Sequence, residues 1–321
     1  MRPASRTALT AFGAVGAVGV SALVWGMGIE RYLFTVRRHE LAVLPEGSPS
    51  LTVLHLSDAH MAPWQHRKQR WIADLADAVQ PDLVVNTGDN LGHDEGIRGI
   101  RAAFEPLRGV PGFFVHGSND KVAPSGRNPL KYFTGPSDHP VRGRRLDTDA
   151  LDAYLSDLGQ TALDNTAASV RVAGLRIDAL GVDDAHREWD DLDAATTAFE
   201  TLPDDGAPRL RLGVTHAPYQ RVLNAFTDAG SDLLLAGHTH GGQVRIPFAK
   251  KALVANCDIP LDQARGRSQW THGGRTVPLN VSAGLGHSIY APVRFGCRPE
   301  ASVLVLRARR ADDSPEGRSA G

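Results

Sequence analysis

The sequence has few cysteines and almost no net charge. Its 321 residues include two cysteines, Cys257 and Cys297, and carry a formal net charge of -1 at pH 7. Two widely separated thiols exclude zinc fingers and iron–sulfur clusters and allow at most one disulfide bond. Because a generic nucleic-acid-binding protein usually has a basic excess, no nucleic-acid partner is expected. The chain has 13 histidines, so a metal site would use imidazoles and carboxylates.

Charged residues are also missing from most of the first 30 residues. Residues 7–29 form an uncharged run of 23 residues rich in Ala, Gly and Val. At about 1.5 Å per residue, a helix of this length crosses a hydrocarbon core of roughly 30 Å. We therefore expect residues 1–30 to be an N-terminal transmembrane anchor. The alternative is a cleaved signal peptide, because Val20-Ser21-Ala22 offers small residues at a plausible cleavage site.

The composition of the rest is that of a folded globular protein, with 42% apolar and 22% charged residues over the whole chain. We expect one catalytic domain over 51–307, preceded by a linker over 31–50 and followed by a disordered tail over 308–321. A large domain behind a lone anchor is usually exported, so a single-pass protein of the cell membrane with an extracytoplasmic catalytic domain is expected. Nearly balanced flanking arginines hardly decide this orientation.

Short apolar runs and helical patterns alternate along this domain, which predicts an α/β fold. The predicted strands end in polar residues and cover 51–56, 82–86, 112–115, 210–214 and 232–236. A hairpin over 170–180 and two further strands over 277–282 and 302–306 complete the expected sheets. Apolar residues at helical spacing predict helices over 70–79, 99–107, 148–158, 192–202 and 219–229.

Five of the predicted strands end in possible metal ligands, and ligands of open α/β sheets bind outside the carboxyl ends of strands. The clusters are Ser57-Asp58-Ala59-His60, Thr87-Gly88-Asp89-Asn90, His116-Gly117-Ser118-Asn119-Asp120, Thr215-His216-Ala217-Pro218 and Gly237-His238-Thr239-His240-Gly241-Gly242. Each is weak alone, because a strand-end Asp is often a helix cap and a buried His often belongs to a core. Their joint occurrence predicts a metal site.

This series resembles the calcineurin-like metallophosphoesterase superfamily, whose pattern is D-x-H, then G-D, G-N-H, a single His, and G-H-x-H. The resemblance covers about residues 51–306, and 237–243 is its most specific piece. The anchored layout and the closing stretch 282–300 resemble the membrane-associated bacterial phosphodiesterase branch. The resemblance implies a four-layer α/β/β/α sandwich of two mixed sheets, with the metals at the carboxyl edges of the sheets.

The resemblance also implies a ligand set for two divalent transition metals, Mn, Fe or Zn, which suit Asp and His ligands. Asp89 would bridge the two ions. Asp58, His60 and His240 would complete one site. His216 and His238 would belong to the other site, with an amide or hydroxyl from the third cluster. Such an enzyme hydrolyses a phosphodiester or related phosphoester by attack of a metal-bound hydroxide.

The third cluster departs from the family pattern, because Gly117-Ser118-Asn119-Asp120 stands where G-N-H-D is usual. Either Ser118 or Asn119 takes the amide position, and we favour Asn119 because an amide oxygen is the better ligand. The usual catalytic histidine is missing. Asn119, Asp120 and His116 are the catalytic candidates in this cluster, although His116 also fits a packed strand histidine. We therefore expect a preference for substrates with acidic leaving groups, such as phosphodiesters or pyrophosphates.

Basic residues supply candidates for substrate binding. Arg127 lies in a loop-like insertion over 121–145 that is rich in Arg and Lys, and a solvated loop is the equal alternative. Arg294 and His287 lie in the closing segment. The anchor suggests a lipid or envelope-linked substrate, but anchoring alone does not choose one. The altered third cluster favours a second hypothesis, a degenerate, non-catalytic domain that binds metal or phosphate as a sensor or partner-binding module.

Overall fold

A computed structural model of the chain describes residues 19–124, 143–249 and 251–310. Two six-stranded mixed sheets form its centre. The first sheet has the order β1 (Thr35–Leu44), β12 (Glu300–Ala308), β2 (Leu51–Leu56), β3 (Leu83–Asn86), β4 (Gly112–Phe114) and β5 (Gln160–Ala162). The second has the order β10 (Gly266–His272), β11 (Arg275–Val281), β9 (Leu233–Ala236), β8 (Arg209–Thr215), β7 (Leu175–Gly181) and β6 (Thr166–Val172). The predicted α/β fold with two mixed sheets is confirmed.

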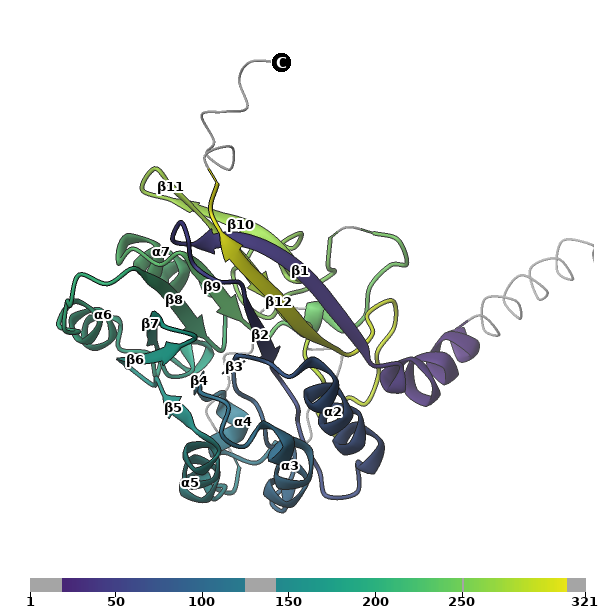
Figure 1. Cartoon of the computed structure of the whole chain (residues 1–321). Coiled ribbons are helices and arrows are strands. Elements are labelled where there is room, and N and C mark those ends of the chain that lie inside the picture. The colour runs from purple at the N-terminus through teal and green to yellow at the C-terminus, as the bar shows by residue number, and fades with distance from the viewer. Residues whose placement is uncertain (1–18, 125–142, 250, 311–321) are drawn as a thin grey trace, which may run out of the picture.

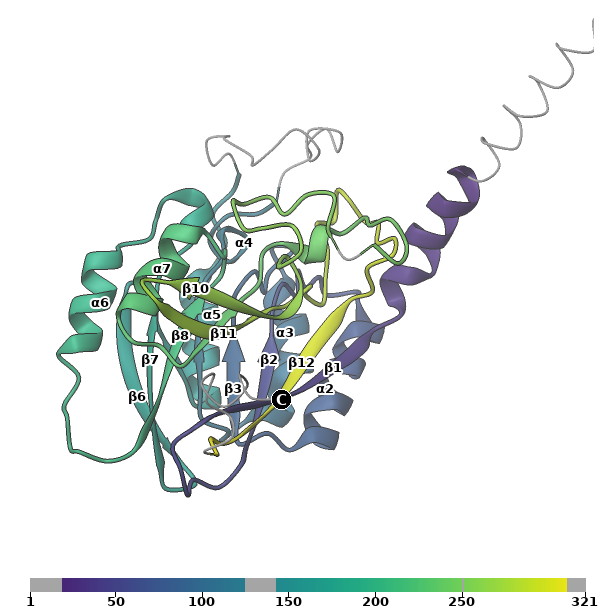
Figure 2. The same ribbon diagram turned by 90° about the horizontal axis from the view of Figure 1, so that it is seen from above.

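The two sheets pack face to face, and helices cover each outer face (Figures 1 and 2). One apolar core joins the sheets, from Val53 and Val85 on one to Ile177 and Leu212 on the other. A second core fills the space under α2 (His66–Val79), α3 (Gly96–Phe104) and α5 (Thr148–Leu158). A third lies under α6 (Leu192–Glu200) and α7 (Gln220–Asp228). These layers explain why the central strands are almost continuously apolar.

Local sequence signals set where the covering helices begin and end. Asp147 precedes α5, and its carboxylate accepts a hydrogen bond from the Ala150 backbone N–H at 3.0 Å. Asp191 caps α6 in the same way through Ala194 at 2.9 Å. Such caps satisfy backbone donors that a helix leaves unpaired, and each contributes about 1 kcal/mol. Gly159 ends α5 with a φ of 103°, a left-handed conformation that suits glycine.

Parallel pairing brings the predicted clusters to one edge of the molecule. β2, β3 and β4 run parallel in the first sheet, and β7, β8 and β9 run parallel in the second. The carboxyl ends of β2, β3, β4, β8 and β9 therefore lie at a shared edge, which we call the carboxyl edge. The short helix α4 (Ser118–Lys121) and the 3-10 turn η5 (His240–Gly242) also lie there.

Residues 31–50 do not form the expected linker, because β1 occupies most of this segment. β1 pairs in parallel with β12 along its length. Its second half buries Leu41, Val43 and Leu44 in the core between the sheets. Burial of each such side chain contributes roughly 1.5–3 kcal/mol. Charged residues over 37–40 obscure the strand pattern in the sequence, and one of them, Arg37, pairs with the buried Glu300 at 3.1 Å.

Two short or polar strands were also not predicted. β5 has three residues, too few for a periodic signal. β10 pairs antiparallel with β11, and only Trp270 of its side chains is buried. The predicted hairpin over 170–180 is present as β6 and β7.

The N-terminal part of the structure begins within a helix over residues 19–28, followed by the 3-10 turn η1 (Glu30–Tyr32). Within 19–124, 143–249 and 251–310, no helix is both long and apolar enough to cross a membrane. Most of the predicted anchor, residues 1–18, lies outside the described residues. Arg127 and the end of the predicted tail, 311–321, lie outside them as well.

Candidate metal centre

The ligand candidates stand on sharp turns at the carboxyl edge. Their backbones adopt positive φ angles that residues other than glycine rarely take: 49° at Asp58, 39° at His60, 55° at Asp89, 66° at His238 and 49° at His240. Such strain persists only where the surroundings enforce it, and it gathers at functional sites. Backbone hydrogen bonds provide that enforcement, for example from Asp58 N–H to the Gly88 carbonyl at 2.8 Å.

The first group comprises Asp58, His60 and His240, whose ligand atoms lie within 4.8 Å of one another. Nε2 of His60 lies 3.9 Å from Oδ1 of Asp58, and Nε2 of His240 lies 3.7 Å from the same oxygen. The two imidazoles stack with their centroids 5.0 Å apart. All three side chains are buried or nearly so. The sequence predicted these three residues as one site, and the structure brings them together.

The second group comprises Asp58, Asp89 and His216, again within 4.8 Å. Oδ2 of Asp89 lies 3.6 Å from Nε2 of His216 and 3.5 Å from Nε2 of His60. Asp89 therefore lies close to a histidine of each group, and Asp58 belongs to both groups. His238 joins the second group through Nδ1, which lies 3.3 Å from Nε2 of His216.

The donor set fits divalent metal ions. Among the described residues, Oδ1 of Asp58 is buried and has no hydrogen-bond partner, and leaving such an atom unpaired is costly. Its other oxygen accepts from Ser57 Oγ at 2.5 Å and from the His238 backbone at 3.0 Å. Glycines keep the site open, since a Cβ at Gly117 would lie 2.2 Å from Oδ1 of Asp89. Asp and His ligands in this number suit Mn, Fe or Zn.

Burial and neighbouring charges shift the pKa values of these groups. Burial raises the pKa of Asp58 to about 6, with the neighbouring Asp89 adding to the rise against an opposing effect of His216. Burial also acts on Asp89, but His216, His60 and hydrogen bonds from Asn119 outweigh it and lower the pKa of Asp89 to about 2. The Asp89 side chain is thus anionic at neutral pH.

The histidines of the candidate centre differ in the direction of their pKa shifts. Burial lowers the pKa of His60 and of His238 to about 4, so these rings are neutral and keep a nitrogen lone pair. Burial lowers the pKa of His240 well below its ordinary value. At His216 the effect of burial is outweighed by Asp89, Asp184 and Asp58, which raise its pKa to about 9. A metal ligand must be deprotonated, so metal binding at His216 would release a proton.

Comparison with known proteins bears on this geometry. The family model described as calcineurin-like phosphoesterase matches residues 51–242. The chain belongs to the calcineurin-like phosphoesterase family. The resemblance expected from the five clusters is therefore confirmed.

Curated relatives of this calcineurin-like phosphoesterase span most of its length. Phosphodiesterase YaeI of Escherichia coli is 25% identical over 85% of this chain and 88% of its own. The metallophosphoesterase YkuE of Bacillus subtilis is 23% identical over 92% of this chain and 96% of its own. A transmembrane protein with a metallophosphoesterase domain from Bos taurus is 25% identical over 83% of this chain and 55% of its own.

In the third cluster, the structure turns Asn119 toward the metal ligands. Its backbone N–H donates to Oδ1 of Asp89 at 2.9 Å, and its side-chain amide lies 2.6 Å from Oδ2 of Asp89. Ser118 instead donates its backbone N–H to Asp184 at 2.9 Å. Asn119 thus contacts Asp89 through its side chain, and its assignment as the amide ligand stays a prediction.

Asp120 and His116 have partners that fit a structural role, contrary to our expectation of catalysis. Asp120 is fully buried, and its Oδ1 accepts from the backbone N–H groups of Asn90 and Leu91 at 2.7 and 3.1 Å. Nδ1 of His116 bonds the Asp164 carboxylate, and its Nε2 lies 2.7 Å from Asp152. Both ring nitrogens of His116 are thus engaged by carboxylates, which fits the alternative of a packed strand histidine.

The two described substrate candidates lie in the closing segment. Arg294 is fully buried, and its guanidinium donates to carbonyls of Ala283 at 2.7 Å, Gly286 at 3.2 Å and His240 at 3.4 Å. These bonds brace η5, which contains His240, and the substrate role of Arg294 stays a prediction. His287 is buried too, with Nδ1 3.0 Å from the Ser288 carbonyl, and its substrate role stays a prediction.

One strand-end cluster was missed in the sequence. β7 is followed by Asp183, Asp184 and the 3-10 turn η4 (Ala185–Arg187). Asp184 accepts from the backbones of Ser118 and His186 at 2.9 Å each, and so ties this turn to the third cluster. The His186 ring lies 4.5 Å from that of His238, centroid to centroid. A strand ending in two aspartates and a histidine was the available signal.

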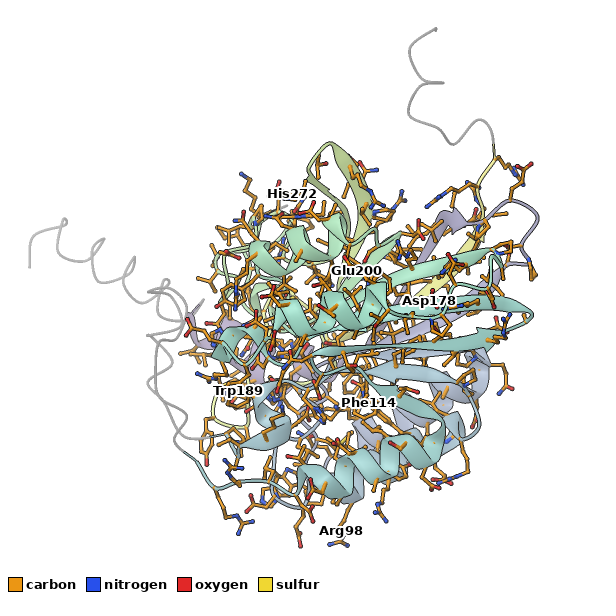
Figure 3. All side chains as sticks on the ribbon, turned by 90° about the vertical axis from the view of Figure 1, so that its left-hand side faces the viewer. Arg98, Phe114, Asp178, Trp189, Glu200 and His272 are labelled. Atoms are coloured by element: carbon orange, nitrogen blue, oxygen red, sulfur yellow. The ribbon has the colours of Figure 1, made fainter. Side chains whose placement is uncertain are left out.

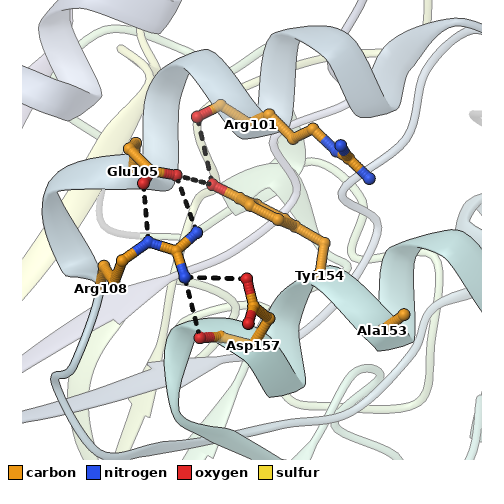
Figure 4. A pocket seen from close by; sticks show the side chains of 6 residues that line it. All are labelled: Arg101, Glu105, Arg108, Ala153, Tyr154 and Asp157. Carbon is orange, nitrogen blue, oxygen red and sulfur yellow. Dashed lines mark hydrogen bonds and ion pairs between the residues drawn. The ribbon is translucent and has the colours of Figure 1, made fainter.

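A charged surface pocket lies between the C-terminal ends of α3 and α5 (Figure 4), close in sequence to the residues where β4 and β5 begin. It is lined by Arg101, Glu105, Arg108, Ala153, Tyr154 and Asp157. Arg108 pairs with Glu105 at 2.7 Å and with Asp157 at 2.8 Å. Its charges are matched within the pocket, and it lies away from the metal ligands, so it is not part of the candidate centre.

Proposed function

We propose that this chain hydrolyses a phosphodiester or related phosphoester with two divalent transition metals, Mn, Fe or Zn. Asp58, His60 and His240 hold one ion. Asn119, His216 and His238 hold the other. Asp89 bridges them.

The observation that carries this proposal is the convergence of the carboxylates and imidazoles around Oδ1 of Asp58, a buried oxygen without a hydrogen-bond partner among the described residues. When bound, the two ions supply the hydrolytic nucleophile and neutralise charge on the phosphoryl group. The protein's part is to hold Asp89 anionic and His60 and His238 neutral, which their shifted pKa values favour. The name of the relative phosphodiesterase YaeI supports a diester substrate.

The third cluster shapes the choice of leaving group. Asn119 bonds Asp89, whereas Asp120 and His116 are engaged elsewhere, so none of the three protonates a leaving group. A substrate with an acidic leaving group needs such a donor least. Phosphodiesters and pyrophosphates with acidic leaving groups are therefore preferred over alkyl monoesters.

The altered third cluster, which lacks the usual histidine, also favours a second candidate, a non-catalytic domain that binds metal or phosphate. One experiment separates the two. The full chain is purified in detergent, its metal content is measured, and a diester, a monoester and a pyrophosphate are assayed with added Mn²⁺. Diester turnover that Asp89→Ala abolishes supports the enzyme. Two bound metals without turnover support the non-catalytic domain, and full activity of Asp89→Ala contradicts the ligand assignment. Comparable turnover of diester and alkyl monoester contradicts the leaving-group preference.

We also propose that residues 7–29 anchor the chain in the cell membrane with the catalytic domain on the extracytoplasmic side. The uncharged run supports this proposal, and two relatives, from Bos taurus and Danio rerio, are named as transmembrane proteins with a metallophosphoesterase domain. A lipid or envelope-linked substrate suits this location. We expect the chain to stay in the membranes after alkaline carbonate extraction. We also expect protease added to spheroplasts to digest the catalytic domain.

A further inference from the structure

Large apolar side chains are exposed on a loop that adjoins the metal ligands. In residues 243–249 and 251–256, which follow η5, Ile246 is 59% exposed, Phe248 fully and Leu253 42%. Phe248 also has a φ of 66°, which an aromatic residue rarely adopts. We call these three side chains the apolar rim. Three exposed large apolar side chains on one short loop favour a surface that contacts something other than water.

The rim is tied to the metal ligands at both ends. Residues 243–249 leave directly from η5, which contains His240. Arg245 donates to the carbonyls of Gly241 at 2.9 Å and Ala249 at 3.2 Å, and so braces the turn that carries Phe248. The chain then returns to Asn256, whose carbonyl lies 3.2 Å from Nε2 of His238. The loop that carries the rim is therefore held at both ends by residues that adjoin the candidate metal centre.

Hydrogen bonds also place the rim beside the N-terminal helix. The Arg245 N–H donates to the Phe295 carbonyl at 2.8 Å, and the Arg294 N–H donates to the Gly26 carbonyl at 3.1 Å. The Glu30 carboxylate accepts from the Gly296 and Cys297 backbones at 3.0 and 2.8 Å. Residues 293–297 thus join the helix to the rim. Both views show the helix on the side of the molecule that lies opposite α6 (Figures 1 and 2).

The helix itself is apolar around its surface. Of the twelve large apolar side chains that are exposed within the described residues, six lie at Val20, Leu23, Val24, Trp25, Met27 and Ile29. A helix that is apolar on every side suits lipid better than water. Its sequence continues the uncharged run that begins at Thr7. The helix and the rim therefore have the same candidate occupant, a lipid bilayer.

We propose that the apolar rim inserts into the bilayer interface beside the N-terminal helix and takes an amphiphilic phosphoester substrate directly from the membrane. This proposal rests on the phosphoesterase function and anchor proposed above. Apolar side chains at the interface bind by burying their surface among the acyl chains. Because the rim adjoins the candidate metal centre in the chain, its insertion would bring the phosphoryl group of a lipid toward the centre while the tails stay in the bilayer.

The first test measures the depth of the rim in the full chain. Phe248→Cys is labelled with an environment-sensitive fluorophore and reconstituted in phosphatidylcholine vesicles that contain doxyl-labelled acyl chains. The matched control is Glu200→Cys, an exposed position on α6 (Figure 3). The unsubstituted chain gives the background from Cys257 and the buried Cys297.

We expect a blue shift and quenching by the doxyl chains at position 248 and neither at position 200. Equal behaviour at both positions overturns the proposal. Shielding of position 248 from aqueous iodide without quenching by lipid also overturns it, because a second copy or another protein would then cover the rim.

The second test compares two substrates with the same leaving group. One is a p-nitrophenyl phosphodiester with a hexadecyl chain in phosphatidylcholine vesicles, and the other is its soluble ethyl analogue. Phe248→Asp is expected to lower vesicle turnover about tenfold, as expected from the lost burial of one large apolar side chain. Turnover of the soluble analogue should be unchanged. The matched control, Thr197→Asp on α6, adds the same charge at an exposed position and should change neither.

The results separate the two proposals. If Phe248→Asp loses turnover equally on both substrates, or loses none on vesicles, the proposed role of the rim is wrong. If the wild-type chain hydrolyses neither substrate, the phosphoesterase function fails, and the label at position 248 still decides whether the rim enters the bilayer.

Discussion

Asn119 holds both oxygens of Asp89. Its backbone N–H donates to Oδ1 at 2.9 Å, and its amide lies 2.6 Å from Oδ2. These contacts join the third cluster to the proposed bridging carboxylate, and they help to lower the pKa of Asp89 to about 2. Ser118, one residue earlier, has its backbone bonded to Asp184 instead.

This difference predicts unequal effects of two neighbouring substitutions. Asn119→Ala removes a proposed ligand and its support of Asp89, so Mn²⁺ affinity and diester turnover should each fall about 10–100-fold. Ser118→Ala, the matched control, should leave both within about twofold, a change well below the tenfold that 1.4 kcal/mol produces. Calorimetric titration with Mn²⁺ and the diester assay measure the two quantities. The reverse order of effects would assign Ser118 as the ligand.

The unpaired Oδ1 of Asp58 predicts a conflict between stability and function. Burial raises the pKa of Asp58 to about 6, so the ionised form that prevails at pH 8 destabilises the metal-free fold. Asp58→Asn removes this charge and should stabilise the metal-free protein by about 1–3 kcal/mol. It should also abolish the gain in melting temperature that Mn²⁺ gives the wild-type protein.

Thermal unfolding at pH 8 with chelator and with Mn²⁺ checks both effects. Asp74→Asn is the matched control, since Asp74 is exposed on α2 and its loss should leave both melting temperatures unchanged. A destabilised Asp58→Asn protein that still responds to Mn²⁺ would show that Asp58 is an ordinary structural carboxylate.

The ion pairs of His116 predict a pH-dependent contribution to stability. Burial opposes its charge, but the hydrogen bonds that His116 donates to the Asp152 and Asp164 carboxylates outweigh burial and raise the pKa of His116 from 6.5 to about 10. A raised pKa stabilises the folded state fully below pH 6.5, and this contribution is lost as the pH rises toward 10. His116→Gln should therefore cost roughly 3 kcal/mol near pH 6, and the difference from wild type should shrink at pH 10.

Urea unfolding at pH 6, 8 and 10 measures this trend, with His66→Gln as control because His66 is exposed at the start of α2. At the acid end, loss of the Asp164 charge limits the same contribution, since the histidine holds the pKa of Asp164 below its ordinary value. A penalty for His116→Gln that is constant with pH would show that packing, not charge, makes this residue important.

Much of the fold and most of the candidate metal centre were predictable because both follow from local patterns. Buried parallel strands are continuous apolar runs, and their carboxyl ends carried the polar clusters. β1 was not predicted because Arg37 and its neighbours mask the alternation of apolar and polar residues in this strand. Its pairing with β12 also joins residues far apart in the chain. No local pattern reports such a pairing.

The roles of single polar residues were less predictable, since a role depends on which partners the fold brings together. Arg294 and His116 have the right chemistry for substrate or proton transfer. Arg294 is nevertheless engaged by backbone carbonyls, and His116 by two aspartates. Asp184 and His186 were missed, although their cluster also follows a strand end, because β7 was expected only as half of a hairpin.

Gly117 predicts how little space the centre tolerates. A Cβ there would lie 2.2 Å from Oδ1 of Asp89 and 2.7 Å from Nε2 of His216, which is too close for either contact. Its φ of -103° suits any residue, so Gly117→Ala tests space alone. The methyl group must push the carboxylate and imidazole apart, and a misplacement of about 1 Å can lower turnover about 100-fold. Overpacking should also destabilise the fold by about 1–3 kcal/mol.

The control is Gly28→Ala, where a Cβ meets nothing within 4 Å, and diester turnover and urea unfolding are measured for both. Wild-type turnover by Gly117→Ala would mean that Asp89 and His216 need not hold this spacing, and the proposed second metal site would then be wrong.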